Sequence, residues 1–216
     1  MQENDIVIRK FKPEDKAGVR IISCETAFLD QPREYFIDDD EILADVLTSY
    51  YTDYEPESCF AALSGREVIG YIIGARDVSV MRRIFNTRII PRLILKSFRK
   101  GLFFKKNALL FFMHAAISFF KREFFQPDFS KTYRATLHIN IEERFRALHI
   151  GASLIESYLE YLKDNGVKGV RFGTISDKAK IFFKKMDFQP LYESKRSYLR
   201  YRLKRDVSFC IFGKIL

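Results

Sequence analysis

Apolar and polar residues alternate along several short stretches of the chain, and this period of two predicts β-strands. The expected strands cover residues 6–10, 59–63, 68–76, 134–141, 167–175 and 198–203. Between them, apolar residues recur at helical spacing. Helices are expected to begin at Pro13, to cover 38–51, to run from Arg146 to a stop at Asn165 and Gly166, and to cover 177–186. This order predicts one domain that mixes strands and helices.

Residues 78–131 interrupt that order after the third expected strand. Two or three helices are expected, over 80–86, 91–100 and 105–124, with breaks at Pro91, Gly101 and Pro127. Ten of the 22 phenylalanines lie between residues 85 and 125, and so many aromatic side chains require an apolar partner. We therefore treat 78–131 as a basic, Phe-rich helical insert.

The charge of the chain is concentrated in two segments of opposite sign. The net charge is +9, and residues 81–122 hold eleven Lys and Arg and no acid. Residues 34–57 hold nine Asp and Glu and no base. Three interpretations of this acidic segment stay open: a solvated face, a partner for the basic insert, or an attractor for a cationic amine.

The insert also admits several interpretations. Its helices either form a lid over the substrate side, make peripheral membrane contact through residues 81–125, or form an oligomer contact. Both a monomer and a homodimer are compatible with this. Nucleic-acid binding is not expected, because the phenylalanines occur in doublets typical of burial and not of base stacking.

Other features exclude broad classes of protein. The cysteines Cys24, Cys59 and Cys210 are widely spaced and form no CxxC pattern, so we expect neither a disulfide framework nor a metal site. The longest apolar run, 108–120, is too short to cross a bilayer. The first ten residues lack the apolar core of a signal peptide, and a cytoplasmic location is expected.

The stretch 137–154, LHINIEERFRALHIGASL, is the most informative part of the chain. It joins an alternating strand to a helix through a short charged turn. The first N–H groups of a helix have no partner inside it, and the helix dipole adds partial positive charge there. This arrangement predicts a site for an anion such as a phosphate.

Two motifs resemble those of the GNAT family of acyl-CoA-dependent N-acetyltransferases. Arg146-x-x-His149-x-Gly151 is similar to the family's pyrophosphate signature, with His149 in place of the usual first Gly. The second motif is similar to the family's Asn-x-x-Ala-x-x-Phe-Tyr-x-x-x-Gly-Phe segment, and here it reads Ser176-x-x-Ala179-x-x-Phe182-Phe183-x-x-x-Asp187-Phe188. The strand YRATLHINI also resembles bacterial acetyltransferases similar to the C-terminal region of O-GlcNAcase.

The resemblance implies a fold and a co-substrate. The fold is an α/β (α+β) GNAT fold over residues 1–205, a mixed, mostly antiparallel, twisted sheet of six or seven strands flanked by helices. A helical insert lies between strands 3 and 4, and 206–216 is a tail. Acetyl-CoA would lie between the diverging strands 135–141 and 169–175. Its implied contacts are Ile139, Ile141, Arg146, Ala147, Leu148, His149, Ile150, Gly151, Ala152, Asp177, Lys180 and Phe183.

The resemblance also implies transfer of an acyl group to a primary amine of a small molecule or a protein. His138 is the candidate base, because an ordinary histidine pKa near 6.5 suits proton transfer at neutral pH. Asn140 shares its face and would position water or the acceptor. Phe183 replaces the family's usual acid, a Tyr, so the acid is Tyr133, Tyr192 or solvent. The alternative is an acyl-CoA-binding module without turnover, regulatory or membrane-associated.

Overall fold

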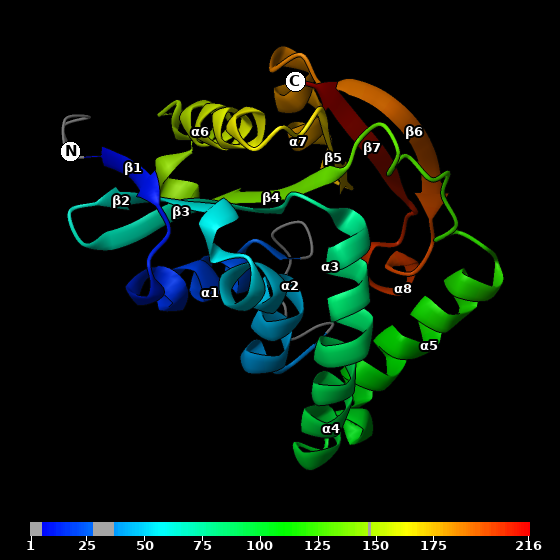
Figure 1. The fold of residues 1–216 in the computed structure, drawn as a ribbon. Helices are drawn as coiled ribbons and strands as arrows, with labels where there is room; N and C mark the ends of the chain where they lie inside the picture. Colours follow the sequence, from blue (N-terminus) through cyan, green and yellow to red (C-terminus); the bar gives the residue numbers. More distant parts are fainter. Residues whose placement is uncertain (1–5, 28–36, 147) are drawn as a thin grey trace.

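The computed structural model describes residues 6–27, 37–146 and 148–216, which form one twisted seven-stranded sheet with helices on both faces (Figure 1). The strand order is β1-β2-β3-β4-β5-β7-β6. Neighbouring strands are antiparallel except β4 and β5, which are parallel. The strands are β1 Ile6–Lys10, β2 Cys59–Ser64, β3 Glu67–Ala75, β4 Ala135–Ile141, β5 Gly169–Thr174, β6 Gln189–Arg196 and β7 Val207–Ile215.

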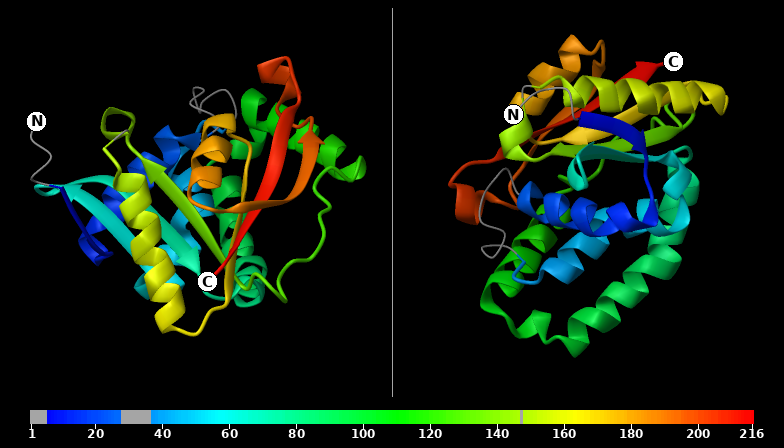
Figure 2. Two further views of the ribbon diagram at one scale, coloured as in Figure 1. Left: turned by 90° about the horizontal axis from the view of Figure 1, so that it is seen from above. Right: turned by 90° about the vertical axis from the view of Figure 1, so that its left-hand side faces the viewer.

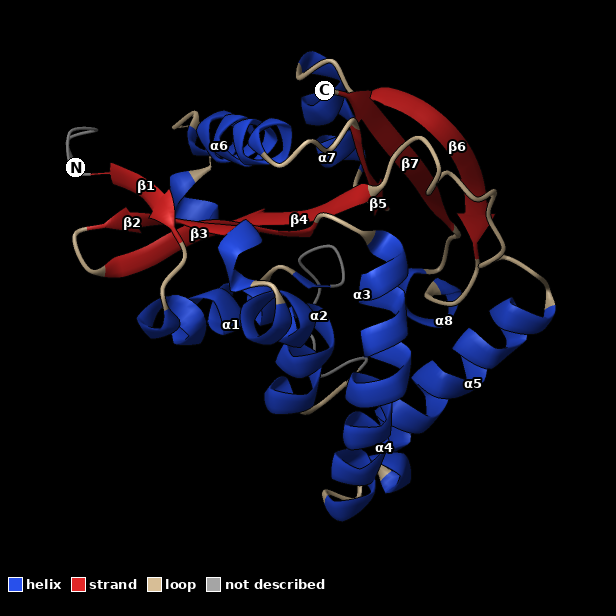
Figure 3. Cartoon of the chain, viewed as in Figure 1, coloured by secondary structure: helices blue, strands red, loops and turns tan. Residues whose placement is uncertain are grey.

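Eight α-helices connect these strands within the described residues (Figure 3). Side chains cap the first turns of two of them: Asp39 Oδ1 accepts the Ile42 N–H at 3.0 Å, and Ser176 Oγ accepts the Ala179 N–H at 3.3 Å. The helices are α1 Lys16–Glu25, α2 Asp40–Tyr54, α3 Val78–Ile84, α4 Ile90–Arg99, α5 Lys106–Phe120, α6 Ile150–Asp164, α7 Asp177–Lys185 and α8 Arg200–Leu203.

The two faces of the sheet carry separate apolar clusters. On one face, α6 and α7 cover the main core, where Leu154 and Tyr158 pack with Ile72 and Leu137. On the other face, α1 covers Tyr71 and Ile73 of β3. Figures 1 and 2 show the insert helices α3, α4 and α5 on the side of α1 and α2. Alternate residues of one strand therefore face two different layers.

The first helical stretch of the insert is longer than its proline suggests. Residues 78–99 are helical without interruption, because a π-turn, Phe85–Ile89, joins α3 to α4 directly before Pro91. Proline lacks an N–H and crowds the preceding turn, and a widened turn accommodates both effects. The expected break at Pro91 was therefore wrong, whereas Gly101, at φ +64°, does separate α4 from the next turn.

Ion pairs join the insert to the acidic segment. Lys96 Nζ lies 2.5 Å from carboxylate oxygens of both Glu41 and Asp45, and Lys100 Nζ lies 2.5 Å from Glu41. Hydrogen bonds from Lys100 and Lys96 lower the pKa of Glu41 to about 2. Lys105 reaches Asp38 in the same way. Of the three interpretations of the acidic segment, pairing with the insert is the one these contacts support.

The C-terminal region differs from the sequence prediction. The expected strand 198–203 is instead helix α8, and the expected tail 206–216 contains β7, which pairs with both β5 and β6. The sequence does not predict the strand β6, because β6 is an edge strand. Its polar sequence, QPLYESKR, leaves most of its side chains in contact with solvent. The chain thus reaches seven strands through a hairpin that the alternation pattern missed.

We expect Phe212→Ala to lower the free energy of unfolding by about 3–5 kcal/mol, because this β7 side chain is 1 % exposed and stacks on Phe172 in the main core. Urea denaturation measures the change. The matched control is Ile215→Ala, on the same strand but 58 % exposed, which should cost about 1 kcal/mol or less. Equal small losses from both variants would show that residues 207–215 contribute nothing to the core.

Candidate functional site

Strands β4 and β5 separate almost as soon as they pair. Their register holds only at Ala135 with Val170 and at Thr136 with Arg171. Farther along β4, the Glu142 N–H donates to Ile69 O at 2.9 Å, so the even-numbered residues of β4 direct their backbone groups toward β3. The odd-numbered residues, including Ile139 and Ile141, therefore present their N–H and C=O groups to the gap between β4 and β5.

Helix α6 begins next to the end of this gap, at Ile150, later than the sequence suggests. Its N-cap, His149, is in the left-handed conformation with φ +57°, where a glycine is ordinarily favoured. The resemblance places a Gly at this position, so the backbone keeps a glycine-like shape although His149 carries an exposed side chain. The expected start at Arg146 was therefore wrong, and the helix begins directly after the left-handed residue His149.

The set of amides available to an anion is smaller than expected. The Arg146 N–H donates to Glu143 O at 3.2 Å, and the Ala152 N–H donates to His149 O at 3.0 Å. The first N–H groups of α6, those of Ile150 and Gly151, have no hydrogen-bond acceptor inside the helix. Together with Leu148 and His149, which are exposed, they form the candidate cradle. Ala147 lies outside the described residues.

Arg146 lies in the turn and not on the helix. Its Nε donates to the carbonyl oxygen of Ile141 at 3.2 Å, so the guanidinium is held at the end of β4. This contact places a cation at the mouth of the gap, beside the start of α6. It also occupies the Ile141 carbonyl, which leaves the groups of Ile139 as the better partners for an extended ligand.

Gly151 permits a close approach of side chains. A Cβ on Gly151 would lie 3.1 Å from Ile141 Cδ1 and 3.2 Å from Phe182 Cζ, both tighter than ordinary contacts. The glycine therefore allows α6 to pack closely against the end of β4 and against α7.

His138 and Asn140 lie together on the opposite face from α6, as their alternation predicted. Asn140 Nδ2 donates to the Tyr71 hydroxyl at 2.8 Å and lies 3.3 Å from His138 Nε2. An amide nitrogen only donates, so Nε2 accepts and His138 carries its proton on Nδ1. The Tyr71 ring packs edge-on against His138, with centroids 5.9 Å apart.

Burial changes the acid–base character of His138. Removal from water disfavours the imidazolium and lowers the pKa of His138 from 6.5 to about 4. The side chain is therefore neutral at pH 7 and able to accept a proton. Its basicity is lower than the ordinary value assumed from the sequence.

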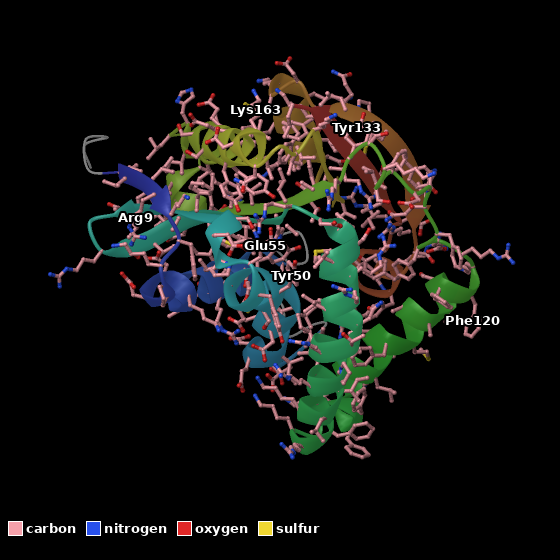
Figure 4. All side chains as sticks on the ribbon, in the orientation of Figure 1. Arg9, Tyr50, Glu55, Phe120, Tyr133 and Lys163 are labelled. Atoms are coloured by element: carbon pink, nitrogen blue, oxygen red, sulfur yellow. The ribbon has the colours of Figure 1, made fainter. Side chains whose placement is uncertain are left out.

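Phe183 cannot donate a proton, and the contacts of Tyr192 and Tyr133, the two candidate acids, lie away from the gap. Phe183 is 3 % exposed and packs on Phe172 with centroids 3.9 Å apart, inside the main core. The Tyr192 hydroxyl donates to Phe125 O at 3.3 Å. Tyr133 packs beside Gly213, where an added Cβ would lie 2.7 Å from its ring, at the paired end of the sheet (Figure 4).

Asp177 and Lys180 pair with each other instead of joining the cradle. Lys180 Nζ lies 3.0 Å from Asp177 Oδ1 and 4.0 Å from Glu193 on β6. Phe182, two residues farther along α7, faces Gly151 instead. Phe182 and Tyr71 are thus the two site residues that the sequence argument did not single out. The stripe of Ala179, Phe182 and Met186 at helical spacing was the available signal for Phe182.

Among the described residues, no cluster of three or more His, Cys, Asp or Glu side chains is placed to hold a metal ion. No helix in that part of the chain combines the length and apolar character needed to cross a membrane.

Comparisons with solved structures identify the fold. The protein named SsHAT superposes with a TM-score of 0.70 at 19 % identity, covering 98 % of both chains. The Drosophila melanogaster polyamine N-acetyltransferase, which forms N-acetylagmatine, gives 0.59 at 14 % identity, covering 98 % of this chain and 100 % of that one. A GNAT-family acetyltransferase from Streptococcus pneumoniae gives 0.54 at 14 % identity, covering 98 % and 99 %. The chain therefore has the GNAT fold.

No protein-family model matches the sequence, and no curated protein is detectably similar to it. The closer resemblance to the O-GlcNAcase-like subgroup stays a prediction.

We expect the stability of the protein to fall as the pH is lowered from about 6.5 to about 4, partly through His138. In this window the unfolded chain protonates its histidine while the folded chain does not, so protons favour unfolding. Urea denaturation across the window measures the slope. His138→Gln should reduce it, whereas His149→Gln, which removes an exposed imidazole, should retain it. An unchanged slope in His138→Gln would contradict the buried, neutral state.

Proposed function

We propose that this protein is an acetyl-CoA-dependent N-acetyltransferase of the GNAT family, which moves an acetyl group directly from the thioester to a primary amine. The observation that carries the proposal is the gap between β4 and β5, which ends at the N-terminus of α6. The solved structures of similar fold include enzymes that act on polyamines and agmatine, which supports an amine as the acceptor.

The residues of this gap fit coenzyme A in three ways. The backbone groups of Ile139 would pair with the extended pantetheine arm as an added strand. The amides from Leu148 to Gly151 would donate to the diphosphate at the positive end of α6. Arg146, held at the end of β4, would supply a compensating cation. Asp177 and Lys180 are paired together and are not included among these contacts.

The transfer breaks a carbon–sulfur bond and forms a carbon–nitrogen bond, so the amine must lose a proton and the thiolate must gain one. We assign the first role to His138, which is neutral and lies on the face of the sheet beneath α1 and α2. It would exchange its contact with Asn140 for one with the amine or a water molecule. The N–H of a splayed β4 residue would hold the oxyanion. Because Phe183 is a buried apolar ring, we assign protonation of the thiolate to solvent.

A second function, acyl-CoA binding without turnover, is favoured by one pair of observations. Position 183 offers no hydroxyl, and the lone pair of His138 Nε2 is directed at Asn140. Both features weaken proton transfer while leaving the gap and the cradle intact. Thiol release from acetyl-CoA in the presence of agmatine, a polyamine and a peptide with a free N-terminus separates the two functions. Binding of CoA without release for any acceptor would select the binding module.

We expect His138→Ala to lower kcat roughly a hundredfold or more while leaving CoA affinity nearly unchanged, because the imidazole faces the acceptor layer and not the cradle. Steady-state kinetics and calorimetry provide the two readouts. His114→Ala serves as the control, since it also removes a half-buried imidazole, one that stacks on Tyr201 of α8. Equal losses in kcat and CoA affinity would remove His138 as the base.

We expect Arg146→Ala to weaken CoA binding roughly tenfold, about 1.4 kcal/mol, through loss of the cation near the diphosphate. The same change should leave the weaker binding of pantetheine, which lacks the diphosphate, nearly unaffected. Arg144→Ala is the matched control, because Arg144 lies in the same turn but pairs with Glu142 on the surface. If both ligands or both variants lost the same affinity, the cradle would be wrongly located.

A further inference from the structure

The insert exposes an apolar surface that nothing in the described chain covers. We call the exposed apolar side chains of residues 94–125 the insert surface. It begins on α4, continues through the turn Leu102–Phe104 and follows α5. Phe104 is 86 % exposed and Phe120 is 83 % exposed. Other large members that are more than half exposed are Leu95, Phe98, Leu109, Phe119 and Phe125.

The members of the insert surface are connected and not scattered. The ring of Phe103 lies 4.7 Å from Phe98 and 5.6 Å from Phe112, so it joins α4 to α5. At the other end of α5, Phe119 lies 6.0 Å from both Phe120 and Phe125. On α5, the small or polar residues Ala108 and Ser118 are buried while Leu109 and Phe120 face solvent. This is the reverse of an ordinary surface helix, and it indicates a docking surface.

The charge around the insert surface is mostly positive, and the one acid within residues 94–125, Glu123, accepts hydrogen bonds from Ser197. Of the eleven Lys and Arg between 81 and 122, Lys96, Lys100 and Lys105 pair with acids of the α2 region. The other eight are exposed and form no ion pair with an acid among the described residues. Two of them bracket the apolar face of α5, with Lys106 at its first residue and Lys121 directly after its last. An apolar helix face flanked by lysines is typical of helices that lie in a membrane interface.

We propose that the insert surface docks on an anionic lipid bilayer, with the phenylalanines in the interface and the unpaired bases on the headgroups. The combination of apolar rings and uncompensated positive charge fits that occupant. A second copy fits less well, because a symmetric contact would bring two basic surfaces together. Nucleic acid matches the charge but not the aliphatic part of the surface, such as Leu95 and Leu109.

Co-sedimentation of the full chain with vesicles tests this docking. We expect binding to equimolar phosphatidylcholine and phosphatidylserine, roughly tenfold or more weaker binding to phosphatidylcholine alone, and loss of binding as salt is raised. The double variant Phe104→Ser with Phe120→Ser should lower binding roughly tenfold or more. Its control is Val7→Ser, an exposed residue of the edge strand β1 that is 57 % accessible.

A charge-reversal pair separates headgroup contact from general electrostatics. Lys106→Glu with Lys121→Glu should also lower binding to the mixed vesicles roughly tenfold or more. Lys163→Glu, on α6 at the opposite side of the molecule from Phe120, should not (Figure 4). Thermal melting followed by circular dichroism checks that every variant remains folded, which the exposure of the altered residues leads us to expect.

Three outcomes would overturn the proposal. One is equal binding to vesicles with and without phosphatidylserine, or none to either. In a second outcome, the phenylalanine variant retains vesicle binding, the lysine variant loses it, and duplex DNA competes with the vesicles for the protein. This would indicate a nucleic-acid surface. The last is a dimer in analytical ultracentrifugation that the phenylalanine variant dissociates, without vesicle binding, which would assign the surface to a second copy.

Discussion

The divergence of β4 from β5 is the constraint on which the rest of this structure depends. Two parallel strands that pair at only two positions leave a row of strand hydrogen-bonding groups without a strand partner. Such groups are costly to bury unless something supplies donors and acceptors. In the protein alone, Arg146 satisfies one of them by donating to Ile141 O. An extended ligand with amide groups is the natural partner for the remainder, and the start of α6 lies where a phosphate at its end would arrive.

The side chains of β4 alternate between the two faces of the sheet, and the two faces carry residues of different kinds. Leu137 and Ile139 face α6 and fix the helix relative to the gap. His138 and Asn140 face the other layer, where Tyr71 holds Asn140 and burial lowers the pKa of His138. In the function proposed above, ligand binding and proton transfer would therefore involve adjacent residues of one strand. A shift of one residue in the register of β3 and β4 would exchange the two roles.

Much of this arrangement could be predicted from local pattern. The antiparallel pair β2–β3, the strand β4 and most of the helices α6 and α7 follow from the spacing of apolar residues alone. The position of His149 followed from a motif, and its left-handed backbone explains why the motif carries glycine there. What could not be predicted depends on contacts between distant segments. The edge strand β6 has no apolar pattern of its own, and only the fold brings its Glu193 to within 4.0 Å of Lys180.

The distribution of charge completes the physical picture. The acids near α2 form ion pairs with Lys96, Lys100 and Lys105, and those pairs attach the insert to the body of the domain. The same pairs neutralise part of the negative charge of residues 34–57. The insert helices lie on the same side of the sheet as α1 and α2 (Figure 2), and the attachment leaves Phe104 and Phe120 exposed. The insert is thus attached to the domain by three of its lysines, and its other Lys and Arg side chains leave positive charge on its surface.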